Sequence, residues 1–300
     1  MLNFLMSKIP YLSALIAERD SLLKAQGIFP AGHFYSPVVS VEEARNDEKR
    51  IFDSIPASLP GIDMNESGQL EILAKFEEIY SSITIPDHAS ISRRYYFDNP
   101  YYSYSDGIFL HCMMRVNEPS KIIEVGSGFS SAIMLDTKDQ YLQYEIEFTF
   151  IEPYPDRLKS LILEADKSSI SIIEARVQDV PICTFRDLGE GDFLVIDSTH
   201  VCKTGSDVNY LLFDVLPTLR SGVLIHIHDI FYPFEYPKEW VFGGRSWNES
   251  YMIRAFLSYN SEFTIEIMNT YLQTLYPQRF FDRMPLCMNN TGGSIWLRKK

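Results

Sequence analysis

Five short and almost continuously apolar runs constrain the fold of this chain more than any other feature of its sequence. Strands that are apolar on both sides need helices on both faces of their sheet, as in the parallel strands of βαβ units. Stretches of helical pattern separate the runs, so we expect a doubly wound α/β sheet. The runs cover residues 121–125 (KIIEV), 148–152 (FTFIE), 170–175 (ISIIEA), 193–197 (FLVID) and 223–229 (VLIHIHD).

Two more apolar runs close the chain and differ from the first five in how they are connected. They cover residues 263–269 (FTIEIMN) and 293–299 (GSIWLRK), and no helix-sized segment of clear 3.6-residue periodicity separates them. Neighbouring parallel strands need a crossover, usually a helix, whereas antiparallel strands do not. We therefore expect these two runs to pair antiparallel.

The first third of the chain predicts helices joined by polar loops. Helical patterns cover residues 11–25, 41–54 and 66–82. We expect a helical N-terminal cap over residues 1–95 and a sheet domain over residues 96–300.

The first 20 residues are apolar, but polar residues and a proline interrupt them too often for a membrane span. They predict an amphipathic helix that packs on the core, with peripheral membrane contact as the alternative.

The charge balance excludes some classes of partner. Among 300 residues, 40 Asp and Glu stand against 27 Lys and Arg, which leaves a net charge of −13. Such a chain repels nucleic acid and anionic lipid. We expect a small-molecule partner, no nucleic acid and no integral membrane segment, and homo-oligomerisation stays open.

The chain has four cysteines, Cys112, Cys183, Cys202 and Cys287. Their spacing is not that of metal ligands, which predicts free thiols and a cytoplasmic protein.

The first strand runs into a glycine-rich turn, Glu124-Val-Gly126-Ser-Gly128-Phe-Ser130-Ser131, which precedes a helical pattern. Glycines at such a turn let backbone N–H groups and a helix N-terminus approach a ligand closely, which suits nucleotides. The dinucleotide fingerprint would place a third glycine where this chain has Ser131, and here the acidic Glu124 precedes the loop. Both departures disfavour NAD. An ordinary strand-to-helix turn is the alternative.

The second and third strands end in further polar groups. Glu152 ends the second strand, and a carboxylate there can accept both hydroxyls of a ribose. Gln178 and Asp179 follow the third strand, where their polar groups could receive an adenine amino group. Solvated surface residues are the alternative for each of the three. The glycine turn one βα unit earlier favours the ligand-binding interpretation.

The order of these features resembles the class I S-adenosylmethionine-dependent methyltransferases over about residues 96–300. The resemblance implies a Rossmann-like seven-stranded sheet, with the last strand inserted antiparallel between the fifth and sixth, and S-adenosylmethionine as cofactor. Glu124 would shape the loop or meet the methionine amine. By position, the other implied cofactor residues are Gly126, Gly128 and Ser130 at the methionine moiety, Glu152 at the ribose, and Gln178 with Asp179 at the adenine.

Four longer segments are similar to one bacterial subfamily of proteins assigned as methyltransferases with a helical N-terminal extension. This similarity spans nearly the whole chain, but it does not name a methyl acceptor. The segments are HFYSP (33–37), YYFDNPYYSYSD (95–106), IDSTHVCKTGSDVNY (196–210) and HIHDIFYPFEYPKEW (226–240).

Polar side chains also follow the fourth and fifth strands. The fourth strand delivers Asp197, with His200 three residues later, and the fifth delivers His226, His228 and Asp229. Because the carboxyl ends of neighbouring parallel strands meet at one edge of the sheet, we expect these side chains to converge there. Structural histidines bonded to backbone carbonyls are the alternative. This alternative is favoured most for His226, which lies one register step away from the others.

This layout resembles catechol-type O-methyltransferases, which hold Mg²⁺ with an Asp after strand four and an Asp-Asn pair after strand five. The resemblance implies Asp197, His228 and Asp229 as metal ligands and places His200 where that group has a lysine. Imidazole favours Zn, Mn or Fe over Mg, so the metal stays open. The alternative is a metal-free site in which His200 or His228 is the general base. His200, His228 and Asp229 are the catalytic candidates.

A segment with eight aromatic residues, 231–251, follows the fifth strand and predicts a lid over the strand edge. Core packing of these rings is the alternative. Arg245, Trp247 and Asn248 are its candidate substrate contacts.

We expect methyl transfer to a small-molecule hydroxyl of a sugar, polyol or phenol. A non-catalytic cofactor-binding or scaffolding protein on the same fold is the main alternative, and an NAD-dependent oxidoreductase is a weaker one.

Overall fold

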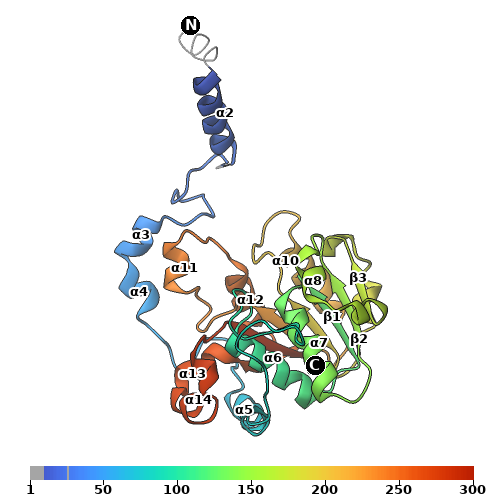
Figure 1. Ribbon diagram of the computed structural model, residues 1–300. Helices are drawn as coiled ribbons and strands as arrows, with labels where there is room; N and C mark the ends of the chain where they lie inside the picture. The colour runs from blue at the N-terminus through green and yellow to red at the C-terminus, as the bar shows by residue number, and fades with distance from the viewer. Residues whose placement is uncertain (1–9, 26) are drawn as a thin grey trace. The chain divides into compact units, whose positions relative to one another are not determined.

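The computed structural model describes residues 10–25 and 27–300 (Figure 1). Its contacts divide the chain into two compact units. One unit comprises Met1–Ile55 with Pro237–Ser246, and the other comprises Pro56–Tyr236 with Trp247–Lys300. Residues 56–95 thus cluster with the sheet, and the boundary expected at residue 95 stays a prediction.

The larger unit is built on one seven-stranded sheet. Its strand order is β3-β2-β1-β4-β5-β7-β6. The first five strands run parallel, and β7 lies antiparallel between β5 and β6. This confirms the expected Rossmann-like fold with its last strand antiparallel. The strands are β1 (Lys121–Val125), β2 (Glu147–Ile151), β3 (Ile170–Ile173), β4 (Phe193–Ile196), β5 (Leu224–His228), β6 (Phe263–Met268) and β7 (Ser294–Lys299).

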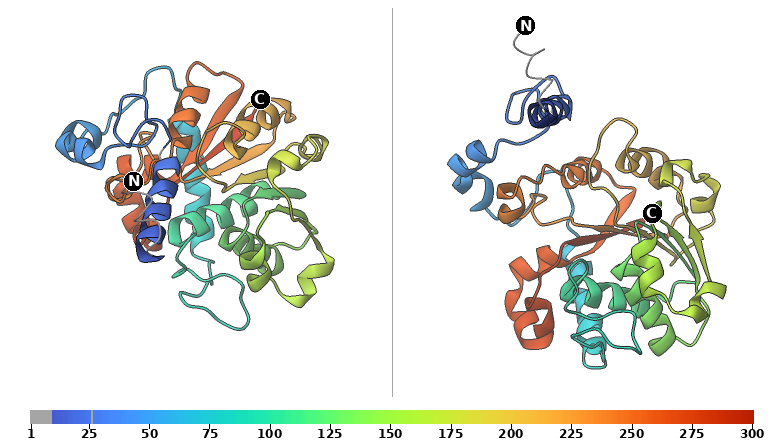
Figure 2. Two further views of the ribbon diagram at one scale, coloured as in Figure 1. Left: turned by 90° about the horizontal axis from the view of Figure 1, so that it is seen from above. Right: turned by 45° about the horizontal axis from the view of Figure 1, so that its top comes forward.

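Helices cover both faces of this sheet (Figure 2), which explains why its central strands are apolar on both sides. All the residues of β4 and β5 are buried, and this includes the histidines of β5. The α-helices of this unit are α5 (Glu66–Tyr80), α6 (Tyr104–Asn117), α7 (Phe129–Tyr141), α8 (Asp156–Leu161), α9 (Cys183–Arg186), α10 (Asp207–Tyr210), α12 (Glu249–Leu257), α13 (Asn269–Leu275) and α14 (Pro277–Arg283).

The connection between β6 and β7 corrects one expectation. The sequence shows no clear helical periodicity there, yet α13 and α14 occupy most of the segment. Each has only seven residues, and Pro277 begins a new helix directly after Tyr276. Two turns of helix are too short to give a clear 3.6-residue pattern, so the prediction of a helix-free connection was wrong.

The smaller unit contains α2 (Pro10–Ala25), α3 (Val41–Asn46), α4 (Glu48–Phe52) and α11 (Lys238–Phe242). The ring of Phe242 lies 4.4 Å from the Arg45 guanidinium carbon and 5.7 Å from the ring of Phe52. Lys238 forms an ion pair with Glu48. Within this unit, the segment 237–246 therefore packs against α3 and α4.

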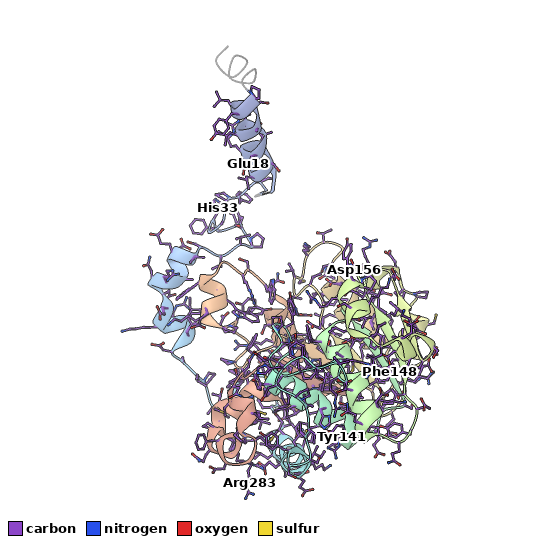
Figure 3. All side chains as sticks on the ribbon, in the orientation of Figure 1. Glu18, His33, Tyr141, Phe148, Asp156 and Arg283 are labelled. Atoms are coloured by element: carbon purple, nitrogen blue, oxygen red, sulfur yellow. The ribbon has the colours of Figure 1, made fainter. Side chains whose placement is uncertain are left out.

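Residues 1–9 lie outside the described residues, and α2 begins at Pro10. No described side chain of α2 is buried, and Glu18 lies on this helix (Figure 3). Because α2 belongs to the smaller unit, its expected packing on the core stays a prediction. Within the described residues, no helix is long and apolar enough to cross a membrane.

A buried arginine fixes the helix that follows the first strand. Arg94 is 6% exposed, and its Nη1 donates to Asp136 Oδ1 on α7 at 2.8 Å. Its Nε donates to Asp166 Oδ2 at 2.8 Å, and its Nη2 also reaches Asp139 at 2.8 Å. These bonds tie the segment before α6 to α7 and to the residues before β3. Since α7 starts at the glycine turn, they also hold that turn in place.

Replacing Arg94 should destabilise the larger unit strongly. Arg94→Met leaves the buried carboxylates Asp136 and Asp166 without their cation, and breaking a buried ion pair from one side costs about 3–5 kcal/mol. We expect the free energy of unfolding, measured by urea denaturation, to fall by about this amount. Lys159→Met removes a half-exposed ion pair with Glu174 and should cost less than about 1 kcal/mol. Equal unfolding midpoints for the two variants would contradict the role of Arg94.

Candidate active site

Two adjoining cavities lie at the carboxyl ends of the parallel strands. The first, of about 390 Å³, is lined by residues from the ends of β1 and β2 and by Gln178, and we call it the Gln178 cavity. The second, of about 360 Å³, is lined by the glycine turn and by residues that follow β4 and β5, and we call it the His200 cavity. The two share five lining residues: Gly126, Glu152, Asp197, Ser198 and Thr199.

The glycine turn lies so close to the end of β4 that a side chain does not fit. Gly126 has φ of +82°, and a Cβ built there would lie 1.8 Å from the carbonyl oxygen of Asp197. Its N–H donates to Ile151 O at 3.0 Å, which fixes the turn to β2. Gly128 is in extended backbone, and a Cβ there would lie 3.1 Å from Cδ of Arg157. Both glycines line the His200 cavity.

Glu124 and two serines lie beneath this turn. Glu124 is fully buried, and the Ser131 hydroxyl donates to its Oε2. The N–H of Gly128 in turn donates to Ser131 Oγ at 3.0 Å. Burial raises the pKa of Glu124 to about 8. Glu124 and the buried Ser130 line neither cavity, so the structure places both beneath the loop rather than on its open side.

Glu152 stands at the junction of the two cavities, just after β2. Its Oε1 accepts the backbone N–H of Tyr154 at 2.8 Å, and its Oε2 accepts that of Ser127 at 3.2 Å. Two backbone donors thus orient the carboxylate, and each oxygen keeps a further lone pair for a ligand. The sequence placed Glu152 at this edge, and the structure brings it together with Gly126 and Gly128.

The two residues expected near an adenine separate in the structure. Gln178 lines the Gln178 cavity, and its Nε2 donates to Gly205 O at 2.9 Å. Asp179 does not line that cavity, and both its oxygens accept bonds from Arg176, at 2.8 and 3.0 Å. Its carboxylate therefore serves an exposed ion pair.

His200 lies at the centre of a group of carboxylates. Its Nδ1 is 2.9 Å from Glu249 Oε2. Its Nε2 lies 3.5 Å from Asp197 Oδ1 and 3.5 Å from Asp229 Oδ2. The ring is 4.5 Å from that of Trp247 between centroids. Burial alone would lower the pKa of His200, but the bonds to Asp197 and Glu249 raise it well above its usual value.

The second histidine of the cavity, His228, ends β5. Its Nε2 lies 3.5 Å from Asp229 Oδ1. Burial would lower its pKa, but Asp229 and Asp197 raise it. Although burial raises the pKa of Asp197, the nearby His228 and His200 bring it down to about 2. The expected convergence of Asp197, His200, His228 and Asp229 is thus present in one cavity.

Two of these residues have an unusual backbone. His200 and Asp229 have φ of +59° and +57°, in the left-handed region that residues other than glycine rarely adopt. Such strain clusters at functional sites, where the surrounding structure holds it. The carbonyl of His200 accepts the N–H groups of Asn248 and Glu249, both at 3.2 Å. The start of α12 therefore fixes both the backbone and the ring of His200.

Sequence reasoning missed Glu249, which comes from a segment far from the strand ends, so no spacing in the sequence pointed to it. Another residue of this site, Tyr102, lies in the aromatic segment 95–106. Tyr102 is buried, its hydroxyl is 3.1 Å from His226 Nε2, and its ring is 4.8 Å from that of His228. Burial lowers the pKa of His226 to about 3, so this histidine is neutral and structural.

The candidate metal ligands meet, but they do not form a metal site. Among residues 10–25 and 27–300, no three His, Cys, Asp or Glu side chains are arranged to hold a metal ion. Asp197 and Asp229 instead both face His200 Nε2. The donor set Asp197, His228 and Asp229 therefore does not fit a metal ion in this arrangement.

The three candidate substrate contacts lie in different surroundings. Trp247 lines the His200 cavity. Asn248 holds the loop after β4, because its Oδ1 accepts from Cys202 N at 2.6 Å and its Nδ2 donates to Cys202 O at 3.1 Å. Arg245 belongs to the smaller unit, where its guanidinium carbon lies 4.1 Å from the ring centroid of Trp240.

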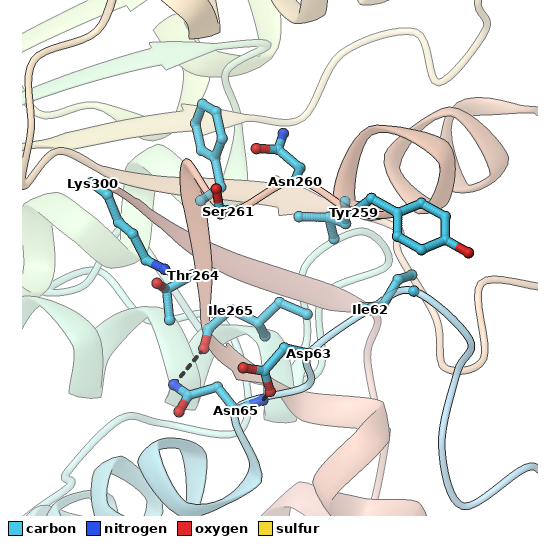
Figure 4. Close-up of a pocket in the computed structure, with 12 residues that line it drawn as sticks. Ile62, Asp63, Asn65, Tyr259, Asn260, Ser261, Thr264, Ile265 and Lys300 are labelled. Atoms are coloured by element: carbon cyan, nitrogen blue, oxygen red, sulfur yellow. Dashed lines mark hydrogen bonds between the residues drawn. The ribbon is translucent and has the colours of Figure 1, made fainter.

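A larger cavity, of about 520 Å³, lies beside the edge strand β6 (Figure 4). Two of its polar side chains have local partners. Asn65 donates to the carbonyl of Ile265 at 2.9 Å, and Asp63 accepts from the N–H of Asn65 at 2.8 Å. Asn65 thus covers a backbone group of the open sheet edge. This cavity holds none of the converging residues described above.

The chain is similar to known proteins in two ways that bear on its family. A family model described as a methyltransferase domain matches residues 123–230. An uncharacterized protein of Archaeoglobus fulgidus is 34% identical over 184 residues, which is 59% of this chain and 82% of that protein.

Solved structures with similar folds have much lower identity. The O-methyltransferase TomG from Streptomyces achromogenes has 16% identity and a TM-score of 0.43, over 77% of this chain and 90% of that one. An O-methyltransferase from Bacillus cereus has 14% identity and a TM-score of 0.41, over 87% of this chain and 100% of that one. Residues 123–230 thus belong to a methyltransferase domain, and the order of the seven strands around it is that of the class I S-adenosylmethionine-dependent methyltransferases.

Proposed function

We propose that this protein transfers the methyl group of S-adenosylmethionine to the hydroxyl oxygen of a small molecule. One observation carries the proposal: Glu152 lines both of two adjoining cavities, and His200 lines one of them. A nucleoside fits against the first group, and a hydroxyl that must lose a proton fits against the second.

The residues present fit the cofactor. The hydroxyls of Ser127 and Ser198 are buried and have no hydrogen-bond partner within the described part of the chain, although both line the His200 cavity. A polar ligand there would satisfy them. We assign the ribose hydroxyls to Glu152 and the adenine to the Gln178 cavity. Asp179, which is paired with Arg176, takes no part.

The methionine end of the cofactor belongs beside Gly126 and Gly128. Both glycines line the His200 cavity, and Gly126 leaves no room for a side chain. Glu124 and Ser130 support the loop from beneath. When bound, the cofactor supplies an activated methyl group on sulfur, so the protein has to align the acceptor, exclude water and take up a proton.

We assign the proton uptake to His200. Glu249 holds Nδ1, which leaves Nε2 directed to the cavity side with Asp197 and Asp229. These three carboxylates favour the imidazolium, so the ring must first lose its own proton before it can take one from the acceptor. The same carboxylates then stabilise the imidazolium that forms again. His228 lies one residue before Asp229 and adds positive charge beside it. Glu249 is then a positioning residue, because it acts through His200.

The walls of the His200 cavity suit a ring-shaped acceptor. Trp247 and Tyr102 line it with aromatic surface, and Asp229 and Thr199 add polar groups. Sugars and phenols present both a flat apolar face and hydroxyls, which matches such a lining. We therefore propose a sugar, polyol or phenol as the acceptor.

Glu152→Gln should weaken cofactor binding. The amide offers one acceptor oxygen instead of two and no charge, which removes about 2 kcal/mol of charge-assisted bonding. We expect the Kd for S-adenosylhomocysteine, measured by calorimetry, to rise about 30-fold. Asp156→Asn changes an exposed carboxylate that lines neither cavity and should leave the Kd unchanged. Equal Kd values for the wild type and Glu152→Gln would refute the ribose assignment.

His200→Ala and Asp229→Ala should separate binding from turnover. Neither residue is assigned to the cofactor, so the Kd for S-adenosylhomocysteine should change little. Loss of a general base costs at least about 100-fold in rate. The assay is formation of S-adenosylhomocysteine with a panel of sugars, polyols and phenols, and His88→Ala, an exposed histidine, is the control. Normal turnover by both variants would overturn the catalytic assignment, and binding by the wild type without any product would favour a scaffolding role.

Metal removal should leave the reaction intact. The donor set does not fit a metal ion, and His200 faces the two carboxylates that would bind one. We expect wild-type turnover to be the same after dialysis against EDTA and after addition of Mg²⁺, Mn²⁺ or Zn²⁺. Activity that disappears with EDTA and returns with one of these ions would show that the proton is removed with the help of a metal.

A further inference from the structure

One permanently cationic side chain faces the His200 cavity. Among the described residues that line this cavity, three are carboxylates, Glu152, Asp197 and Asp229, and one is an arginine or lysine, Arg157. Glu152 and Asp197 also line the Gln178 cavity, and their negative charge suits the cofactor, whose positive charges lie on its sulfonium and its amine. The amino-acid tail also carries a carboxylate, and that group needs a cation.

Arg157 is placed by two contacts at the glycine turn. It is the second residue of α8, which follows Glu152 at the end of β2. Its Cδ lies where the missing side chain of Gly128 would be, 3.1 Å from an ideal Cβ. Its guanidinium carbon lies 3.8 Å from the ring centroid of Tyr101. Tyr101 stacks in turn on Phe129, the first residue of α7, with ring centroids 6.1 Å apart. The guanidinium is thus held above the loop where we place the methionine moiety.

Within the described residues, no carboxylate forms an ion pair with the guanidinium of Arg157. The neighbouring cations do form ion pairs: Lys159, on the same helix, pairs with Glu174, and Arg176 pairs with Asp179. Arg157 forms no ion pair with any described residue. Its guanidinium contacts the Tyr101 ring through one face, which leaves the N–H groups at the edge of the guanidinium available. A planar guanidinium with such donors matches a carboxylate in bidentate fashion.

We propose that Arg157 binds the carboxylate of the amino-acid tail of S-adenosylmethionine. The inference rests on the proposed function, because it places the methionine moiety at Gly126 and Gly128. Tyr101 presents the guanidinium, and the absence of a side chain at Gly128 lets it approach the loop. Arg157 is a specificity residue here, since it distinguishes a cofactor with a carboxylate from one without.

The test compares two ligands that differ only in this carboxylate. S-adenosylmethionine and its decarboxylated form share the adenosine, the sulfonium and the amine. We would measure the Kd of both by calorimetry for the wild type and Arg157→Met. For S-adenosylmethionine, we expect the variant to bind about tenfold more weakly, as for the loss of a charge-assisted pair near solvent. For the decarboxylated ligand, we expect no change.

Two further variants sharpen the comparison. Lys159→Met removes one positive charge from the same helix without touching the cavity, so both Kd values should stay at the wild-type level. Arg157→Lys keeps the charge but loses the planar fork, and its Kd for S-adenosylmethionine should lie between those of the wild type and Arg157→Met.

The outcomes separate this inference from the proposed function. If Arg157→Met weakens both ligands equally, Arg157 acts by shaping the loop and the inference is wrong. If it weakens neither, the carboxylate is bound elsewhere, or Arg157 serves an anionic acceptor, and the inference is again wrong while cofactor binding stands. If the wild type binds neither ligand, the proposed function fails, and the inference fails with it.

Discussion

The close contact between the turn after β1 and the end of β4 is the constraint on which the site depends. A side chain at Gly126 would collide with the carbonyl of Asp197, so the two strand ends meet only because residue 126 is a glycine. That contact brings the loop and Asp197 to the same wall of both cavities. Arg94 then anchors α7, the helix that leaves the loop, through Asp136. This arrangement places the glycine turn and Asp197 in the lining of the same cavities.

Charge gives the site its chemistry. Three carboxylates, Asp197, Asp229 and Glu249, surround His200. Asp229 also lies 3.5 Å from His228, and both Asp229 and Asp197 raise the pKa of His228. Buried carboxylates without a cation are costly, and here the imidazole rings supply the compensating charge. The acid excess seen in the sequence is therefore partly structural, because some of these carboxylates stabilise protonated histidines. Arg157 provides the single opposite charge among the described arginines and lysines at the His200 cavity.

The strands and the residues at their ends could be predicted from the sequence because both are local features. The apolar run 121–125 is β1 with the same bounds, and Asp197, His200, His228 and Asp229 converge because parallel strands share one carboxyl edge. Glu249 and Arg157 could not be predicted, since their places depend on how α12 and α8 pack. The short helices α13 and α14 were missed for a related reason: two turns of helix are too short to show a clear 3.6-residue pattern.

The most direct test of cofactor binding at the carboxyl edge is a crystal structure of the protein with S-adenosylhomocysteine. We predict density for the ribose hydroxyls within hydrogen-bond distance of Glu152, with the adenine in the Gln178 cavity and the homocysteine sulfur beside Gly126. Density for the ligand in the cavity beside β6, or a protein that binds no S-adenosylhomocysteine at saturating concentration, would contradict the assignment of this site.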